Sequence, residues 1–136
     1  MQPLQQTLKT NCGQTCFAML TGIPYSQVVQ LYGHESSSGM LEARILFADI
    51  GYSVGDVTKV DNRKKLEIPK GKRAMVRIKY NNRKHGHFIA MDEKGKIYDP
   101  ANGMVFDNID ILLQVYNKAW DGVKVLVSHY FTLEKL

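Results

Sequence analysis

The stretch HGHFIAMDEKGKIYDPANG, residues 85–103, decides the second half of the fold. Two runs with strand-like apolar patterns flank residues 93–95, and a three-residue hairpin loop of this kind ends on a glycine in the left-handed conformation. In this register Asp99 lies diagonally across from His87 on one face of the sheet, within reach of its imidazole. The stretch therefore predicts an antiparallel hairpin that carries a histidine–aspartate pair.

The segments around this hairpin predict further strands, a long loop and one helix. Residues 52–60 alternate in the manner of a strand, and residues 61–72 are typical of a loop. Residues 73–80 alternate basic and apolar side chains, which predicts a half-solvated antiparallel strand. Residues 108–120 have helical spacing, and residues 123–133 predict a final strand.

The N-terminal part of the chain instead carries helical signals. Helices are predicted over residues 12–21, from Pro24 to Gly33, and over residues 39–50, each followed by a glycine that stops it. The apolar residues expected on the inner faces of the second and third helices are Val28, Val29, Leu31 and Tyr32, and Leu41, Ile45, Leu46 and Ile50.

Length and composition indicate one globular domain. The chain has 136 residues, of which 44% are hydrophobic and 23% charged. We expect a single domain over residues 1–136, with a helical part at 1–51 packed on an antiparallel sheet part at 52–136, which is an α+β fold. No apolar run reaches the length of a membrane span, and no signal peptide is seen, so we expect a cytoplasmic location.

Residues 59–84 carry most of the positive charge. They hold eleven basic and two acidic residues, a net +9, whereas the rest of the chain sums to −4. Such asymmetry creates a field that attracts an acidic protein, a nucleic acid or an anionic surface, although a solvated strand-and-loop face is the simpler interpretation. The segment lacks interleaved aromatic residues beyond Tyr80, which counts against a nucleic-acid module.

The two cysteines lie one helical turn apart, where a mutual disulfide would strain the helix. Cys12 follows Thr10 and Asn11 at a predicted helix start, and the helix dipole there favours a thiolate. Cys16 lies one turn further along and is expected to be a buried packing residue. The sequence thus indicates Cys12 as a candidate nucleophile.

Three motifs together resemble the papain-like, bacteriocin-processing peptidase domains found on some ABC transporters. They are QQTLKTNCGQTCFAML at 5–20, HGHFIAM at 85–91 and YDPANG at 98–103, and the resemblance covers nearly the whole chain. Asn11 and Thr15 stand where that family more often has aspartate and alanine. Small stand-alone domains of this kind are also similar to bacterial toxins and effectors delivered into the cytoplasm of a target cell.

The resemblance implies a papain-like fold and a thiol protease mechanism without a cofactor. Cys12 would attack a carbonyl carbon, His87 would transfer protons, and Asp99 would orient His87. Gln6 corresponds to the family's glutamine, which would stabilise the oxyanion together with the Cys12 backbone N–H. The implied activity is cleavage of a peptide or amide bond, with a peptide or protein as the substrate. If the chain is a toxin, we also expect an acidic immunity or inhibitor protein to bind residues 59–84.

Several alternatives remain open at this point. The same catalytic set could support a glutamine deamidase or transglutaminase, and a basic toxin domain could act on RNA. His85 is the alternative base and Gln5 the alternative oxyanion donor, while Cys12, Cys16, His85 and His87 are ligand types that suit zinc. Surface or core roles are expected for the other histidines and the C-terminal aromatic residues, namely His34, His129, Tyr116, Trp120, Tyr130 and Phe131.

Overall fold

The computed structural model describes residues 1–119 and 121–136, so the expected core position of Trp120 lies outside the described residues. The described elements form an α+β arrangement, as predicted. None of the described helices has the length and apolarity that a membrane span requires. In chain order the elements are α1 (Cys12–Thr21), α2 (Tyr25–Tyr32), α3 (Met40–Asp49), β1 (Tyr52–Val54), β2 (Thr58–Lys59), β3 (Arg73–Tyr80), β4 (His87–Met91), β5 (Ile97–Asp99), β6 (Met104–Phe106), α4 (Ile109–Ala119) and β7 (Val125–Lys135).

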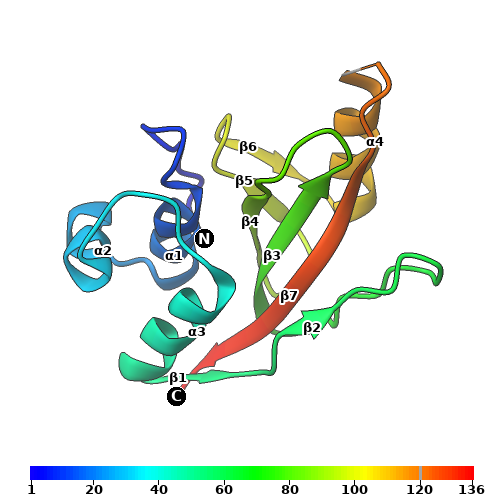
Figure 1. The fold of residues 1–136 in the computed structure, drawn as a ribbon. Helices are drawn as coiled ribbons and strands as arrows, with labels where there is room; N and C mark the ends of the chain where they lie inside the picture. Colours follow the sequence, from blue (N-terminus) through cyan, green and yellow to red (C-terminus); the bar gives the residue numbers. More distant parts are fainter. Residues whose placement is uncertain (120) are drawn as a thin grey trace.

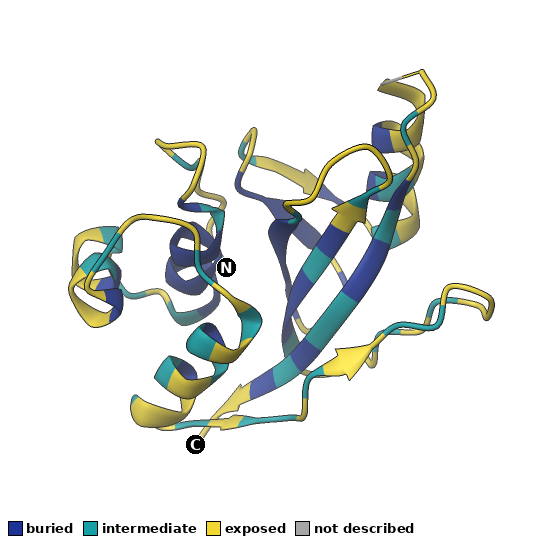
Figure 2. Cartoon of the chain, viewed as in Figure 1, coloured by how far each residue is buried: buried dark blue, intermediate teal, exposed yellow. Residues whose placement is uncertain are grey.

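The sheet is antiparallel and has helices on both faces. Its strand order is β1-β7-β3-β4-β5-β6, and β2 also pairs with β7. Figure 1 shows α1, α2 and α3 together on one side and α4 on the other, and each side has its own apolar core. The strand β3 was expected to be half-solvated. It lies inside the sheet, and its buried residues contribute to both cores (Figure 2).

The helix bounds follow the sequence signals, but part of the predicted buried face is wrong. Leu31, Leu41 and Ile45 are exposed, with 39%, 66% and 58% of their surface accessible. The helix α3 instead buries Phe47, whose ring stacks on that of Phe17 with centroids 4.0 Å apart. The apolar spacing predicted Leu41 and Ile45 inside, but the aromatic contact with α1 turns the face of Phe47 inward.

The β4–β5 hairpin has the predicted register. Ala90 pairs with Tyr98, and the N–H of Asp92 donates to the carbonyl of Lys96 over 3.0 Å. The loop ends on Gly95 with φ of +88°, the left-handed conformation that a three-residue loop requires. The prediction of this hairpin is confirmed.

Two strand predictions needed correction. The segment 52–60 is not one strand, because β1 and β2 are separated at Gly55, whose N–H donates to the carbonyl of Thr132 over 2.8 Å. The strand β6 was not predicted at all. It pairs with β5 at the edge of the sheet, and its exposed Met104 and Val105 do not follow an inside–outside alternation.

A bulge in β7 redistributes its side chains between the two cores. Arg77 pairs with His129 and Ile78 pairs with Val127, so Ser128 is one extra residue in β7. As a result, Val127 belongs to the α4 core whereas Phe131 belongs to the core under α1. Without the extra residue these two odd-numbered side chains would face the same way.

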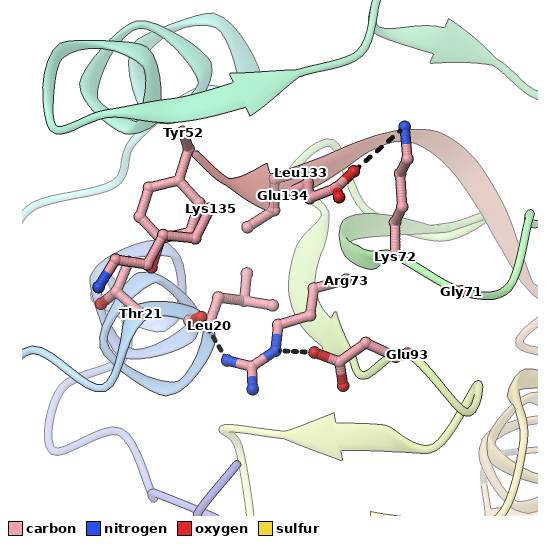
Figure 3. A pocket seen from close by; sticks show the side chains of 10 residues that line it. All are labelled: Leu20, Thr21, Tyr52, Gly71, Lys72, Arg73, Glu93, Leu133, Glu134 and Lys135. Carbon is pink, nitrogen blue, oxygen red and sulfur yellow. Dashed lines mark hydrogen bonds and ion pairs between the residues drawn. The ribbon is translucent and has the colours of Figure 1, made fainter.

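Arg73 fixes the C-terminal end of α1 against the sheet. Its Nη1 donates to the carbonyl of Leu20 over 2.7 Å and its Nε to Glu93 Oε1 over 2.6 Å (Figure 3). These residues line the pocket shown in Figure 3, where Lys72 also forms an ion pair with Glu134 over 3.6 Å. A cation at a helix C-terminus satisfies carbonyls that have no partner within the helix. This clamp holds α1 so that its opposite, N-terminal end reaches the start of β4.

Candidate active site

Cys12 is half-buried and is the first residue of α1. Asn11 occupies the N-cap position, but its side chain does not cap the helix. Its Oδ1 accepts the N–H of Leu8 over 3.1 Å, and its Nδ2 donates to Tyr25 Oη over 2.7 Å. Asn11 therefore holds the N-terminal segment against the start of α1. The Cys12 sulfur accepts a hydrogen bond from the backbone N–H of Gly13.

His87 and Asp99 are in direct contact. The Nε2 of His87 donates to Asp99 Oδ1 over 2.8 Å, and Asp99 is only 1% exposed. The same oxygen accepts the N–H of Ala101 over 2.9 Å, so Asp99 also organises the turn that follows β5. Asp99 thus contacts His87 and stabilises the following turn through the same oxygen.

Tyr116 is a site residue that the sequence analysis missed. It was assigned to the core, and it is buried there, but its hydroxyl also donates to Asp99 Oδ2. The donor comes from α4, on the face of the sheet opposite α1. A tyrosine among the apolar residues of a buried helix face was the available signal, because a buried phenol needs a hydrogen-bond partner.

Cys12 and His87 shift each other's titration toward an ion pair. Burial raises the pKa of the Cys12 thiol, but the hydrogen bond and charge of His87, with the N–H groups of Phe88 and Gly13, lower it below its ordinary value overall. Burial lowers the pKa of His87, whereas hydrogen bonds to Asp99 and Cys12 raise it to about 9. Since Asp99 engages Nε2, the nitrogen that faces Cys12 is Nδ1. These shifts favour a thiolate–imidazolium pair near neutral pH.

Asp99 and Cys16 complete the electrostatic picture. Burial raises the pKa of Asp99, but His87, Tyr116 and the N–H of Ala101 outweigh it and lower the pKa overall. Burial raises the pKa of the Cys16 thiol well above its ordinary value. Asp99 is thus held as a carboxylate, and Cys16 as a neutral thiol that is fully buried.

Gln6 lies beside the Asp99 turn, with its amide engaged locally. Its backbone N–H donates to the carbonyl of Pro100 over 2.7 Å, and its Nε2 donates to the carbonyl of Leu8 over 2.6 Å. The second N–H of that amide is the one left for an oxyanion, while Oε1 is buried and has no hydrogen-bond partner among the described residues. The alternative donor, Gln5, is exposed.

A groove of about 360 Å³ opens at Cys12. The alternative base, His85, lines it and is exposed, but the hydrogen bond to Cys12 comes from His87. A substrate carbonyl placed in this groove would meet the sulfur at the positive end of α1. The lining residues are Lys9, Thr10, Cys12, Ser37, Ser38, Arg77, His85, Gly86 and Phe88.

The geometry does not favour the zinc alternative. Within residues 1–119 and 121–136, no three His, Cys, Asp or Glu side chains are gathered as metal ligands would be. Cys16, one of the four ligands considered, is fully buried in the apolar core. A thiol in contact with an imidazole is an arrangement that can act as a nucleophile beside a base.

Comparisons with known proteins add no family to this picture. A scan against protein-family models finds no match, and no curated protein matches the chain significantly. The chemistry of the site is therefore inferred from its own contacts, burial and charges.

Proposed function

We propose that this chain is a papain-like cysteine hydrolase that cleaves peptide or amide bonds. The observation that carries the proposal is the continuous contact from the Cys12 sulfur through the His87 imidazole to the Asp99 carboxylate. A nucleophile at a helix start, with its base and orienting carboxylate on an antiparallel sheet, is also what the papain-like resemblance implies. Tyr116 is a positioning residue in this mechanism, because it acts through Asp99.

In the first step the Cys12 thiolate attacks the carbonyl carbon of the scissile amide. A bond forms between sulfur and carbon, and the carbonyl electron pair moves onto oxygen. The Cys12 backbone N–H and the free N–H of the Gln6 amide are the proposed donors to that oxyanion. The His87 imidazolium then gives its Nδ1 proton to the leaving amine, the carbon–nitrogen bond breaks, and a thioester remains.

In the second step water releases the acyl group. Neutral His87 takes a proton from water as its oxygen attacks the thioester carbon. The carbon–sulfur bond then breaks, the acid product leaves, and the proton on His87 restores the ion pair. Asp99 stays ionised throughout and stabilises the imidazolium, which is the role of a triad carboxylate.

The first test measures whether Cys12 has this reactivity. Each cysteine is alkylated with iodoacetamide between pH 5 and 10, and labelling is quantified on peptides by mass spectrometry for wild type and His87→Ala. We expect fast labelling of Cys12 near pH 6 that depends on His87, with Cys16 unreactive. Labelling of Cys12 only above about pH 8, with no effect of His87→Ala, is the behaviour of an ordinary thiol and would overturn the proposal.

The second test identifies the reaction. A peptide mixture with blocked amines is incubated with wild type or with Cys12→Ala, and the products are compared by mass. New free N-termini identify a peptidase, whereas intact peptides with an amide converted to an acid identify a deamidase. Incorporation of an added small primary amine into a peptide amide, with loss of ammonia, identifies a transglutaminase. Wild-type products that also form with Cys12→Ala would exclude all three interpretations.

A further inference from the structure

The groove that opens at Cys12 has two cationic side chains on its walls, and no carboxylate among the described residues lines it. Its lining includes Lys9 and Arg77 and no acidic residue. Among the described residues, neither cation forms an ion pair with a carboxylate. By contrast, Arg73 on the same strand is paired with Glu93. The two cations beside the nucleophile are therefore available to a charge that comes from outside the chain.

The Arg77 guanidinium is held in the groove by its neighbours. Its Nη1 donates to Ser128 Oγ over 2.9 Å, and the Ser128 hydroxyl donates to the Arg77 carbonyl over 3.1 Å. Ser128 is 4% exposed and is the extra residue of the β7 bulge. A Cβ on Gly86 would lie 2.5 Å from the backbone carbonyl oxygen of Ile78 and 2.7 Å from Arg77 Cζ, so the backbone contact requires glycine there and the guanidinium packs against it. A bulge and a glycine thus fix this cation next to the residue that precedes His87.

The positive charge continues across the sheet from the groove. His129 lies directly opposite Arg77, and Lys59 lies opposite His129, so all three side chains share one face. Burial first, and then the charges of Arg77, Lys59 and Lys79, lower the pKa of His129. The lowered pKa disfavours a charge on His129, so the cations of this row are Arg77 and Lys59, which flank it. The row therefore adds to the attraction that the groove exerts on an anion.

We propose that this groove binds a carboxylate of the substrate, so that the enzyme acts on amide bonds near an aspartate or glutamate side chain or near a free C-terminus. The inference rests on the proposed function, because Cys12 must be the reacting group. The guanidinium nitrogens that Ser128 does not use would take the carboxylate oxygens, since a planar guanidinium fork matches a carboxylate. Lys9, which is exposed, would close the subsite from the N-terminal segment.

The test uses two alkylating reagents that differ only in charge. Iodoacetate carries a carboxylate where iodoacetamide carries an amide. With either reagent the Cys12 thiolate displaces iodide, so one sulfur–carbon bond forms as one carbon–iodine bond breaks. The measured quantity is the iodoacetate-to-iodoacetamide rate ratio at Cys12, at pH 7 and low salt, in wild type, Arg77→Gln, Lys9→Gln and the double variant. The matched control is Lys64→Gln, in the loop after β2 (Figure 1).

We expect the ratio to fall roughly fivefold in Arg77→Gln, less in Lys9→Gln, and not at all in Lys64→Gln. Any preference left in the double variant belongs to the His87 imidazolium. Lys9→Gln alters only an exposed side chain, so it remains informative if Arg77→Gln fails to fold. A ratio that is the same in wild type and in all three groove variants would overturn the carboxylate subsite while leaving the proposed function intact. Slow reaction of wild-type Cys12 with both reagents would instead contradict the proposed function.

A second pair of probes separates the two sources of carboxylate. Bromoacetyl-glutamate α-amide is compared with bromoacetyl-glutamine α-amide, and bromoacetyl-glycine with its amide. A preference for the glutamate probe that depends on Arg77 assigns a side-chain carboxylate. A preference for bromoacetyl-glycine with the same dependence assigns a C-terminal one. Equal rates within both pairs would exclude recognition of a carboxylate from either source.

Discussion

The first and second turns of α1 each carry a cysteine, and the two thiols have opposite properties. Cys12 is half-buried and its pKa is lowered, whereas Cys16 is fully buried and its pKa is raised. Both belong to the same helix, so the macrodipole alone does not account for the contrast, although it favours the first turn. The difference is that Cys12 meets His87 at the start of β4, while Cys16 meets only the apolar core. The lowered pKa of Cys12 thus depends on the contact between a helix and a strand.

Substitution of each cysteine by alanine tests this contrast most strongly. Cys12→Ala should abolish alkylation at this position and reduce hydrolysis by about a thousandfold or more, because no nucleophile remains. Cys16→Ala should retain alkylation at Cys12 and hydrolysis. The small cavity it leaves should lower the free energy of unfolding by an amount on the order of 1–2 kcal/mol. Product formation and urea denaturation measure the two effects. Equal loss of activity in both variants would contradict separate roles.

His87→Ala should make Cys12 resemble a buried thiol. Its pKa should rise above the ordinary value, because burial persists after the lowering interactions are lost. Alkylation at pH 6 should slow at least about tenfold, and the pH profile should move to the alkaline side. The control is His129→Ala, which removes a histidine from the same sheet. If both substitutions slowed alkylation equally, the lowered pKa of Cys12 would not depend on its contact with His87.

Asp99→Asn should weaken the fold in a pH-dependent manner. The pKa of His87 is about 9 in the folded protein against 6.5 for an ordinary histidine, so the stability from its charged form is complete below pH 6.5. That contribution is lost as the pH rises through about 9. The loss of unfolding free energy in Asp99→Asn should therefore be about 2 kcal/mol at pH 6 and smaller at pH 9.5. An equal loss at both pH values would indicate that the partner of Asp99 is not charged.

Tyr116→Phe should produce the smallest change. Loss of its hydroxyl removes one hydrogen bond from Asp99 but leaves the contact with His87, so Cys12 alkylation at pH 6 should slow by about threefold. The acid limb of the pH profile should move slightly to higher pH, which a merely structural change would not cause. Tyr98→Phe is the matched control, because that hydroxyl donates to Asp92 in the hairpin. Equal shifts in both variants would remove Tyr116 from the site.

The parts of the site predicted from sequence depend on local chemistry. The loop ending on Gly95 and the alternation of its flanking strands determine the hairpin register, and the register alone brings Asp99 beside His87. The bounds of α1 also follow from local signals, since the helix begins at Cys12 and Gly22 ends it as expected. Spacing could not find Tyr116, because a helical pattern identifies a buried face without telling which buried hydroxyl meets which carboxylate.

The amino-acid sequence by itself determined the helix that presents Cys12, the hairpin that pairs His87 with Asp99, and the excess of positive charge at residues 59–84. Each of these depends on interactions between residues that are close along the chain. Only the tertiary structure decided that Cys12 reaches His87, that Ser128 is an extra residue in β7, and that Arg77 lines the groove. These features depend on how separate layers pack, and the packing energy is shared among many side chains rather than encoded in one segment.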